Sequence, residues 1–269
     1  MNIGRITELI EKADGVLICA GAGMGVDSGL PDFRGNEGFW NAYPPYRKLG
    51  LEFTEMANPD WFNKKPEFAW GFYGHRLNLY RKTIPHRGFD ILLKLVKQKK
   101  DNYFIFTSNV DGQFQKAGFS HDKIVECHGS IHNLQCIKGC SGIWEADTYE
   151  PIIEKDTMIA KNDLPYCPKC ESIARPNILM FNDWKWISER TDIQYKKMNQ
   201  WLLQKQRIVI IELGAGTAIP TVRYMSERIV KKKDASLIRI NVREFKVPYK
   251  QIGVSLGALE AMELISLNS

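Results

Sequence analysis

The sequence predicts an α/β protein: a Rossmann-like parallel sheet with a helical insertion and a small cysteine-bearing module. Three observations support this prediction. Short, continuously apolar segments alternate with amphipathic ones, as expected for strands that helices cover on both faces. A glycine-rich turn over residues 21–25 directly follows the first apolar segment. Two pairs of closely spaced cysteines interrupt the alternation in the middle of the chain.

The elements of the predicted core follow in chain order. Residues 3–10 carry isoleucine and leucine at helical spacing, which predicts a first helix with one apolar face. Residues 16–20 are continuously apolar and predict a buried strand. Ligands of open α/β sheets bind beyond the carboxyl ends of the strands, so the small and polar residues at these ends predict a nucleotide pocket. Four later strands are predicted in the same way, at residues 103–107, 123–127, 207–213 and 237–241.

Two stretches depart from the strand–helix rhythm and are interpreted as insertions. Residues 36–85 are rich in aromatic side chains and predict helices and loops. Residues 131–186 contain four of the six cysteines. The predicted organisation is therefore a nucleotide-binding domain formed by residues 1–35, 86–130 and 187–269, interrupted by these two insertions.

The composition is that of a globular protein with a sizeable core, since 44% of the 269 residues are hydrophobic and 25% are charged. The net charge of +6 suits an anionic ligand but is too small to predict nucleic-acid binding. No segment approaches the roughly 20 apolar residues of a membrane span. No secretory signal is recognisable either. We therefore expect a cytoplasmic protein with reduced cysteines, no membrane association and no direct binding of nucleic acid.

The cysteine spacing predicts a metal site. Cys136-x3-Cys140 and Cys167-x2-Cys170 form two short knuckles, and zinc prefers four soft ligands in a tetrahedron. Four cysteine ligands would leave no open coordination position, so we expect a structural Zn²⁺ within a zinc-binding module at residues 131–186. The alternative is four structural thiols without a metal. Cys19 and Cys127 lie in apolar segments and are expected to be core residues.

The glycine-rich turn is a weak signal by itself. Such a turn lets the backbone approach a pyrophosphate and aims helix amides at it. A dehydrogenase would add a second strand ending in Asp or Glu about 20 residues later. Residues 28–35 and the aromatic segment after them show no such strand. No G-x-x-x-x-G-K-[ST] motif occurs either, so a hydride-transfer enzyme and an NTPase are both disfavoured.

Several motifs, in one order along the chain, resemble those of the sirtuin family. Gly21-Ala22-Gly23-Met24 and residues 28–35 (Ser-Gly-Leu-Pro-Asp-Phe-Arg-Gly) resemble the family's signature loop. Residues 107–111 (Thr-Ser-Asn-Val-Asp) are similar to its Thr-Gln-Asn-Ile-Asp motif, and His128-Gly129 to its catalytic His-Gly. Residues 175–181 resemble the segment that pairs with the substrate peptide. The cysteine pairs fall where the family keeps its zinc.

The resemblance implies an NAD-dependent protein-lysine deacylase that acts on acylated protein substrates and releases nicotinamide and O-acyl-ADP-ribose. His128 would be the general base, with a pKa suited to that task, and Asn109 and Asp111 would complete the catalytic group. By itself, His128 could be a core histidine and Asp111 a helix N-cap. The expected substrate-pairing residues are Ile178, Met180 and Phe181. The expected NAD-binding residues are Gly21, Ala22, Gly23, Asp32, Phe33, Arg34, Ser108, Asn109, Asp111, Gly214, Gly216, Thr217 and Asn241.

Individual roles follow from the same resemblance. The amides of the glycine turn would carry the pyrophosphate, and Asp111 would accept a hydrogen bond from the nicotinamide carboxamide, with Asp32 nearby. Phe33 would cover the ribose carbon and exclude water, and Arg34 would fix the loop. The remaining histidines have no such context and are interpreted as structural or surface residues: His75, His86, His121 and His132.

One motif bears on the acyl group. Tyr73 and Arg76 match a Tyr-x-x-Arg pattern found in sirtuins that prefer succinyl, malonyl or glutaryl lysine. The i, i+3 spacing places both on one helix face, where a guanidinium and a hydroxyl can bind a carboxylate together. The alternative is a surface tyrosine and arginine beside a core helix.

The sequence also departs from the family pattern. Ser108 stands in place of the usual glutamine, Gly25 in place of a serine, and Asn182-Asp183 in place of Gly-Glu. The Thr-Ser-Asn variant resembles that of sirtuins associated with ADP-ribosyl transfer. An ADP-ribosyltransferase or NAD glycohydrolase is therefore the alternative enzyme, and an NAD-sensing module without chemistry is a third possibility, disfavoured by Asn109, Asp111 and His128.

Overall fold

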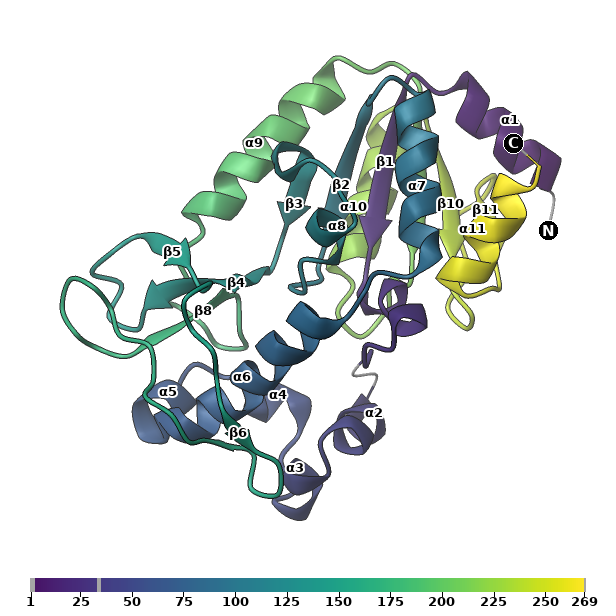
Figure 1. The fold of residues 1–269 in the computed structure, drawn as a ribbon. Helices are drawn as coiled ribbons and strands as arrows, with labels where there is room; N and C mark the ends of the chain where they lie inside the picture. Colours follow the sequence, from purple (N-terminus) through teal and green to yellow (C-terminus); the bar gives the residue numbers. More distant parts are fainter. Residues whose placement is uncertain (1–2, 33–34, 269) are drawn as a thin grey trace.

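The computed structural model describes residues 3–32 and 35–268 and is built around a six-stranded parallel sheet (Figure 1). The strand order is β11-β10-β9-β1-β2-β3, and every neighbouring pair is parallel. The strands are β1 (Gly15–Ala20), β2 (Tyr103–Thr107), β3 (Ile124–Glu126), β9 (Ile208–Leu213), β10 (Ala235–Ile240) and β11 (Ile252–Val254). The predicted Rossmann-like sheet is thereby confirmed.

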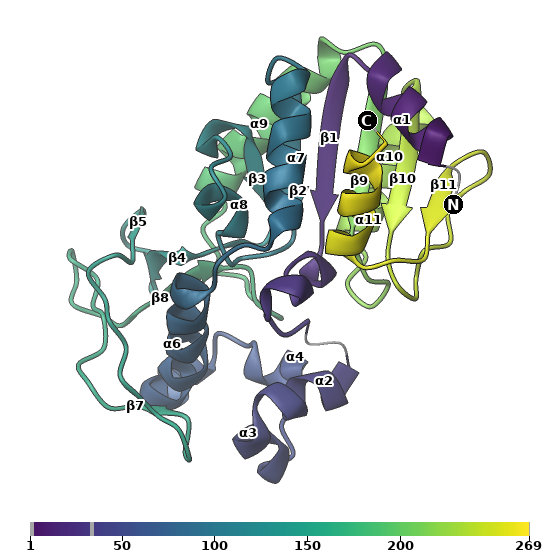
Figure 2. The ribbon, with the colours of Figure 1, turned by 45° about the vertical axis from the view of Figure 1, so that its right-hand side comes forward.

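Helices cover both faces of the sheet (Figure 2). Along β1, alternate side chains belong to two different cores: Val16 and Ile18 to one, Leu17 and Cys19 to the other. This two-sided burial is why the strand is continuously apolar. The first core also contains residues of α1 (Ile3–Lys12), α7 (Arg87–Gln98) and α11 (Ala258–Ser266), and the second those of α9 (Glu189–Leu203) and α10 (Thr221–Lys232).

A smaller region lies on the side of the sheet to which β1 points (Figure 1). Its helices are α2 (Gly35–Ala42), α3 (Pro44–Lys48), α4 (Phe53–Met56), α5 (Trp61–Lys64) and α6 (Pro66–Lys82). Its strands are β4 (Gly129–Cys136), β5 (Ile143–Glu145), β6 (Ile153–Glu154), β7 (Ile159–Ala160) and β8 (Ala174–Ile178). They form the antiparallel sheet β5-β4-β8 and the ribbon β6-β7.

Helix α6 joins the two insertions through a third core that is rich in tyrosine and phenylalanine. The Trp70 indole donates a hydrogen bond to the Ala174 carbonyl at 2.9 Å. A Cβ on Gly71 would lie 1.7 Å from the Met158 carbonyl oxygen, so only glycine allows the helix to approach ribbon β6-β7 this closely. Residues predicted to form separate insertions therefore share one core.

The remaining short elements lie in the connections between strands of the sheet. They are α8 (Gln113–Lys116) and the 3₁₀ turns Ala22–Met24, Val26–Ser28 and His121–Lys123. Among the helices of the described residues, none is long and apolar enough to cross a bilayer.

The predicted strands are confirmed to within two residues at each end, whereas β11 was not predicted. Its three residues, Ile252 to Val254, are too few for a periodic pattern, and pairing with β10 defines them as a strand. The division of the chain into domains at residues 36, 86, 131 and 187 stays a proposal.

Candidate active site

The carboxyl ends of neighbouring strands bring the predicted site residues together. The hydroxyl of Thr107, the last residue of β2, donates to the Ala20 carbonyl at 3.0 Å. The Asn109 side-chain amide donates to the Gly21 carbonyl at 3.1 Å. Ser108 is half-buried between them, and its N–H donates to Ala20. Two motifs whose bonded residues are 87 and 88 residues apart in sequence thus form one surface, as expected at the edge of a parallel sheet.

Glycines allow the backbone of the turn after β1 to approach the backbone of the loop after β9. A Cβ on Gly21 would lie 2.7 Å from the Ala215 Cα, and one on Gly214, whose φ is +61°, would lie 2.3 Å from the Gly23 carbonyl carbon. The Gly21 and Gly23 amides donate to the carbonyls of Leu213 and Gly214, both at 3.0 Å. Two of the three amides predicted to bind the pyrophosphate therefore donate within the protein. The third, the amide of Ala22, takes part in neither of these bonds.

A small pocket of ≈ 130 Å³ opens beside this turn, and Gly23, Asp32, Gly214 and Asn241 line it with Leu256, Gly257 and Ala258. It is smaller than the roughly 300–1,000 Å³ of typical small-molecule sites, so it suits one part of a dinucleotide. Asn241 shapes the pocket with its side chain. Its Oδ1 accepts from the amides of Arg243 and Glu244 at 3.0 Å, and its Nδ2 donates to the Ala215 carbonyl at 3.0 Å.

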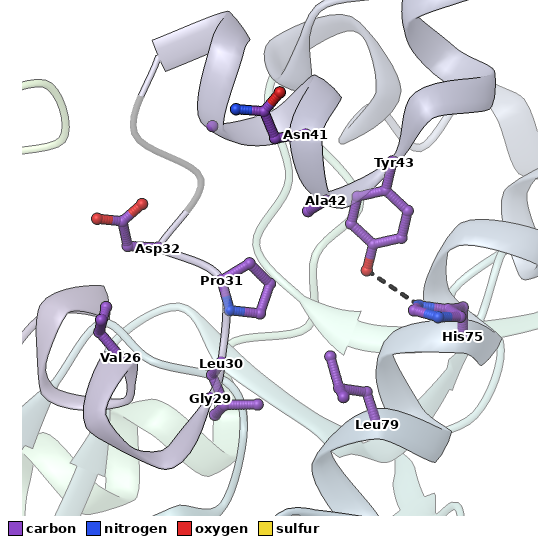
Figure 3. A pocket seen from close by; sticks show the side chains of 11 residues that line it. Val26, Gly29, Leu30, Pro31, Asp32, Asn41, Ala42, Tyr43, His75 and Leu79 are labelled. Atoms are coloured by element: carbon purple, nitrogen blue, oxygen red, sulfur yellow. Dashed lines mark hydrogen bonds between the residues drawn. The ribbon is translucent and has the colours of Figure 1, made fainter.

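A larger pocket of ≈ 470 Å³ lies on the other side of Asp32, between the loop 26–32 and helix α6 (Figure 3). Val26 and Asp32 line both pockets, so the two cavities are adjacent. The Tyr43 hydroxyl points at His75 and lies 3.2 Å from its Nδ1. Burial lowers the pKa of His75, which is therefore a neutral imidazole at pH 7. Sequence reasoning missed this pair, because 32 residues separate its members.

His128 follows β3 and enters the site from a third strand. Its Nε2 lies 3.3 Å from the Thr221 hydroxyl, at the start of α10. Burial lowers the pKa of His128, and the Ser108 backbone opposes this shift. A neutral imidazole is the form that can accept a proton. A Cβ on Gly129, whose φ is +78°, would lie 2.0 Å from the Asn177 carbonyl oxygen, which explains the glycine after His128.

Asp111 is 8% exposed, and burial raises the pKa of its carboxyl to about 6; the nearby Glu126 charge adds to this shift. Its Oδ1 accepts a 2.9 Å hydrogen bond from the Gln113 amide, so the residue does cap the first turn of α8. Its Oδ2 takes no part in that bond. His132 supports the loop, since its Nε2 lies 3.0 Å from the Asp111 carbonyl oxygen. The cap and the proposed carboxamide contact are therefore compatible.

The segment predicted to pair with a substrate runs past His128. The Leu179 amide donates to the His128 carbonyl, and the Phe181 amide to the Ala57 carbonyl, both at 2.9 Å. Ile178 and Met180 are buried. These bonds fix the segment beside the candidate base.

The departure at residue 183 has a structural explanation. Both oxygens of Asp183 bind the Arg175 guanidinium at 2.8 Å, with side chains that are 0% and 1% exposed. The Asp183 carboxylate also accepts from the amides of Met180 and Lys185, at 3.4 and 3.2 Å. Asp183 therefore closes the turn after the substrate-pairing segment.

Tyr73 and Arg76 lie in the aromatic core and are buried, so the surface alternative is wrong. The Arg76 guanidinium lies 5.9 Å from the Tyr73 ring, and its Nε and one terminal nitrogen donate to the Tyr80 hydroxyl at 3.0 and 2.8 Å. Among the described residues, no group forms a hydrogen bond with the buried Tyr73 hydroxyl. The helix thus presents a cation and an unsatisfied hydroxyl to the interior.

The four predicted metal ligands form one cluster, with all Sγ atoms within 4.8 Å of one another. Four sulfur–sulfur distances are 3.1 to 3.7 Å. A tetrahedral zinc site with Zn–S bonds of about 2.3 Å requires about 3.8 Å between sulfurs, so the geometry fits Zn²⁺. Cys19 and Cys127 are core residues, as predicted, and burial raises the pKa of each thiol.

The other predicted NAD contacts lie at the end of β9. The Thr217 amide and hydroxyl donate to the carboxylate of Glu244. The sequence did not single out Glu244. Gly216 lies beside the same carboxylate. Phe33 and Arg34 lie outside the described residues.

The chain is similar in sequence to proteins of one family. Residues 21–210 match the family model described as the Sir2 family. Two relatives named NAD-dependent protein deacylase are similar over most of their length. The one from Aquifex aeolicus (strain VF5) is 28% identical over 229 residues, covering 85% of this chain and 84% of that protein. The one from Pyrococcus abyssi (strain GE5 / Orsay) is 29% identical over 242 residues, covering 90% and 87%.

Solved structures share the fold. A Sir2 homologue in complex with NAD has a TM-score of 0.74 at 23% identity, covering 98% of this chain and 93% of that one. A Sir2 protein bound to acetylated peptide has a TM-score of 0.71 at 18% identity, covering 100% and 98%. Because the family model spans far more than half of the sequence, the chain belongs to the Sir2 family.

Proposed function

We propose that this protein is an NAD-dependent protein-lysine deacylase. The observation that carries the proposal is His128. It is a half-buried imidazole with a lowered pKa, it lies between Ser108 and Thr221, and its carbonyl accepts a hydrogen bond from the substrate-pairing segment. Membership of the Sir2 family and relatives named as NAD-dependent protein deacylases support it.

NAD, when bound, supplies an electrophilic ribose carbon and nicotinamide as leaving group. The Asp111 carboxylate would accept a hydrogen bond from the carboxamide, and Asn109, fixed on the Gly21 carbonyl, would contact the same end of the cofactor. The Nε2 of His128 would take a proton from a ribose hydroxyl, and this transfer requires the neutral imidazole that burial favours. Asp32, between the two pockets, would flank the nicotinamide.

We further propose that the acyl group has an acidic end. Tyr73 and Arg76 supply a hydroxyl and a guanidinium from one face of α6, and the Tyr73 hydroxyl is buried without a hydrogen-bond partner among the described residues. A buried hydroxyl of this kind costs about 1–3 kcal/mol unless it is satisfied. The carboxylate of a succinyl or malonyl group would satisfy it and pair with the guanidinium. The substrates would be acylated proteins of the cytoplasm, without direct nucleic-acid binding.

The first experiment is a mass-spectrometric product assay with NAD and matched acetyl-lysine and succinyl-lysine peptides. We expect O-acyl-ADP-ribose, and a loss of about 10²- to 10⁴-fold in His128→Ala, the usual contribution of general-base catalysis. Thr221→Val is the matched control, since it removes only the hydroxyl beside Nε2. Nicotinamide release without either ester would instead indicate ADP-ribosyl transfer or NAD hydrolysis, as the Ser108 variant suggests.

A second comparison tests the acyl preference. Arg76→Met should lower activity on succinyl-lysine much more than activity on acetyl-lysine, because it removes the cation and keeps the length of the side chain. Tyr73→Phe should shift the ratio in the same direction by less, since it deletes one hydroxyl. An unchanged succinyl-to-acetyl ratio in Arg76→Met would reject the acidic-acyl proposal while leaving the deacylase proposal intact.

A further inference from the structure

The hydroxyl of Thr221 is directed at the candidate general base. Its Oγ1 lies 3.3 Å from the Nε2 of His128, which stands 93 residues earlier in the chain. Among residues 3–32 and 35–268, the structure gives this hydroxyl no second hydrogen-bond partner. The hydroxyl therefore neither caps α10 nor binds the neighbouring loops, and its contact with the imidazole requires an explanation of its own.

Helix α10 fixes the position of Thr221. Thr221 is the first residue of this helix, and Val222 and Met225 are buried in the core that α9 and α10 share on one face of the sheet. The Arg223 guanidinium binds the same turn of the helix to the Ala215 carbonyl at 3.2 Å. A β-branched side chain such as threonine also has few χ1 orientations open to it. The hydroxyl is thus held at a defined point beside the imidazole.

The surroundings of His128 favour a neutral ring with an unprotonated Nε2. Burial lowers the pKa of His128, and the positive end of the α10 dipole, which lies at Thr221, acts in the same direction. The Ser108 backbone raises the pKa of His128, as a carbonyl does when it accepts a hydrogen bond from the ring. Because Nε2 faces Thr221, we assign the proton of the neutral ring to Nδ1. Thr221 is then the donor, and Nε2 is the acceptor.

The same hydroxyl can serve the ring after the proton has moved. In the proposed reaction, Nε2 takes a proton from a ribose hydroxyl, and the electron pair of that O–H bond stays on the ribose oxygen, which attacks the acyl carbon. Nε2 has one lone pair, so the ribose hydroxyl must replace Thr221 there before the transfer. Afterwards Nε2 carries a hydrogen, and the Thr221 oxygen can accept it in a hydrogen bond, because a hydroxyl is both donor and acceptor.

We infer that Thr221 is a positioning residue for the general base: its hydroxyl holds the His128 ring in the orientation needed for proton transfer, gives way to the ribose hydroxyl and then accepts from the Nε2–H that results. This inference rests on the proposed deacylase function. Thr221 belongs to none of the motifs recognised in the sequence. Because it acts through His128, its removal should slow only the step that requires the base.

The first measurement needs no ligand. Nitrogen-15 NMR of ring-labelled histidine reports the tautomer of each imidazole and whether its unprotonated nitrogen accepts a hydrogen bond. The chain has five histidines, and His128→Gln identifies the signals of residue 128. We expect the Nδ1–H tautomer in the wild type. In Thr221→Val, the Nε2 signal should move toward that of a free pyridine-type nitrogen, whereas Thr221→Ser should keep the wild-type value. The signals of His132, whose Nε2 lies on the Asp111 carbonyl, should not change.

The second measurement separates the base step from the step before it. With NAD and an acyl-lysine peptide, Thr221→Val should lower ester formation about three- to tenfold, the effect of one hydrogen bond and far less than that of His128→Ala. Departure of nicotinamide creates the electrophilic carbon and precedes the proton transfer, so exchange of labelled nicotinamide into NAD should stay within about twofold of the wild type. Thr221→Ser should restore ester formation. Ser226→Ala is the matched control, because it removes a hydroxyl of α10 that binds the Val222 carbonyl and not the imidazole.

Thermal unfolding without ligands would verify that each variant is folded. An Nε2 signal that does not respond to Thr221→Val, or ester formation that is unchanged in this variant, overturns the role of Thr221 and leaves the deacylase proposal intact. A parallel loss of ester formation and nicotinamide exchange also overturns it, because Thr221 would then act on binding and not through the base. If the wild type forms no ester, the deacylase proposal itself fails, and the inference that rests on it fails with it.

Discussion

The six-stranded sheet and the smaller region are both well buried, but they are stabilised in different ways. The side chains around the sheet are mostly aliphatic, and the central strands β1, β2 and β9 are buried along their whole length. The smaller region has an aromatic core, a three-stranded antiparallel sheet, a two-stranded ribbon and a four-cysteine cluster. The six-stranded sheet is thus stabilised mainly by the pairing and two-sided burial of its strands. The smaller region depends more on contacts made by single side chains.

Those individual contacts are mainly bonds from side chains to backbone. Besides Trp70, the Arg81 guanidinium donates to the Tyr149 and Ala146 carbonyls at 2.7 and 2.8 Å, and the Asn78 amide donates to Pro151 at 2.7 Å. Each depends on one residue, so a single substitution or loss of the metal should affect the smaller region far more than the sheet. The predictions below test this difference.

The largest effect is expected from loss of the metal. Structural zinc contributes on the order of 10–16 kcal/mol in zinc-finger peptides, which equals or exceeds the stability of most domains. Chelation, or Cys167→Ser, should therefore abolish hydrogen-exchange protection in β4, β5 and β8 while β1, β2 and β9 stay protected. Cys19→Ala is the control, because its thiol lies in the sheet and the protein should keep its zinc. Equal loss of protection in both regions would contradict the comparison.

The second-largest effect is expected at the buried ion pair between Arg175 and Asp183. Arg175→Met should lower the free energy of unfolding by about 3–5 kcal/mol, because it leaves the Asp183 carboxylate buried without its cation. Chemical denaturation would measure the change. Arg175→Met combined with Asp183→Leu should recover most of it, since no unpaired charge is left. If the double variant is as unstable as the single one, packing is the cause and not the charge.

Asp111 follows β2 of the parallel sheet and contacts His132 of the smaller region. Its substitution should raise the free energy of unfolding, whereas the two changes above lower it. Burial raises its pKa from 3.8 to about 6, so ionised Asp111 lowers stability above pH 6, and this cost disappears as the pH falls from about 6 to 4. Asp111→Asn should therefore raise the free energy of unfolding at pH 8 by roughly 2–3 kcal/mol, at about 1.4 kcal/mol per pKa unit. The gain should vanish near pH 4. Activity should fall in the same variant, because a site residue has been removed.

The smallest effect is expected at the contact between α6 and ribbon β6-β7. Gly71→Ala gains about 0.5–1 kcal/mol of helix propensity, but its Cβ would lie 1.7 Å from the Met158 carbonyl oxygen. Overpacking costs about 1–3 kcal/mol, and a clash with a backbone oxygen belongs at the upper end of that range, so the net result should be a loss of about 2 kcal/mol. Gly142→Ala is the control, because a Cβ at that position would have no atom within 4 Å beyond its chain neighbours. Thermal unfolding of both variants would separate the two cases.

The sequence predicted the sheet well because each of its central strands is buried on both faces, and two-sided burial leaves an uninterrupted apolar run. It predicted the cysteine cluster because ligand spacing is local within each knuckle. The smaller region was less predictable. Residues 36–85 were predicted as helices and loops, without bounds for any single helix. The sequence also left open whether Tyr73 and Arg76 are exposed, and the structure shows that both are buried.

The sequence by itself determined the fold class, the order of the site motifs and the metal ligands, since each is encoded by residues close together in the chain. The tertiary structure decided which partners those residues have. Thr221 beside His128, Glu244 on Thr217 and Tyr43 on His75 are pairs whose members are 27 to 93 residues apart. No local pattern records such pairs, because they form only when the carboxyl ends of separate strands and the helices beyond them are brought to one edge of the sheet.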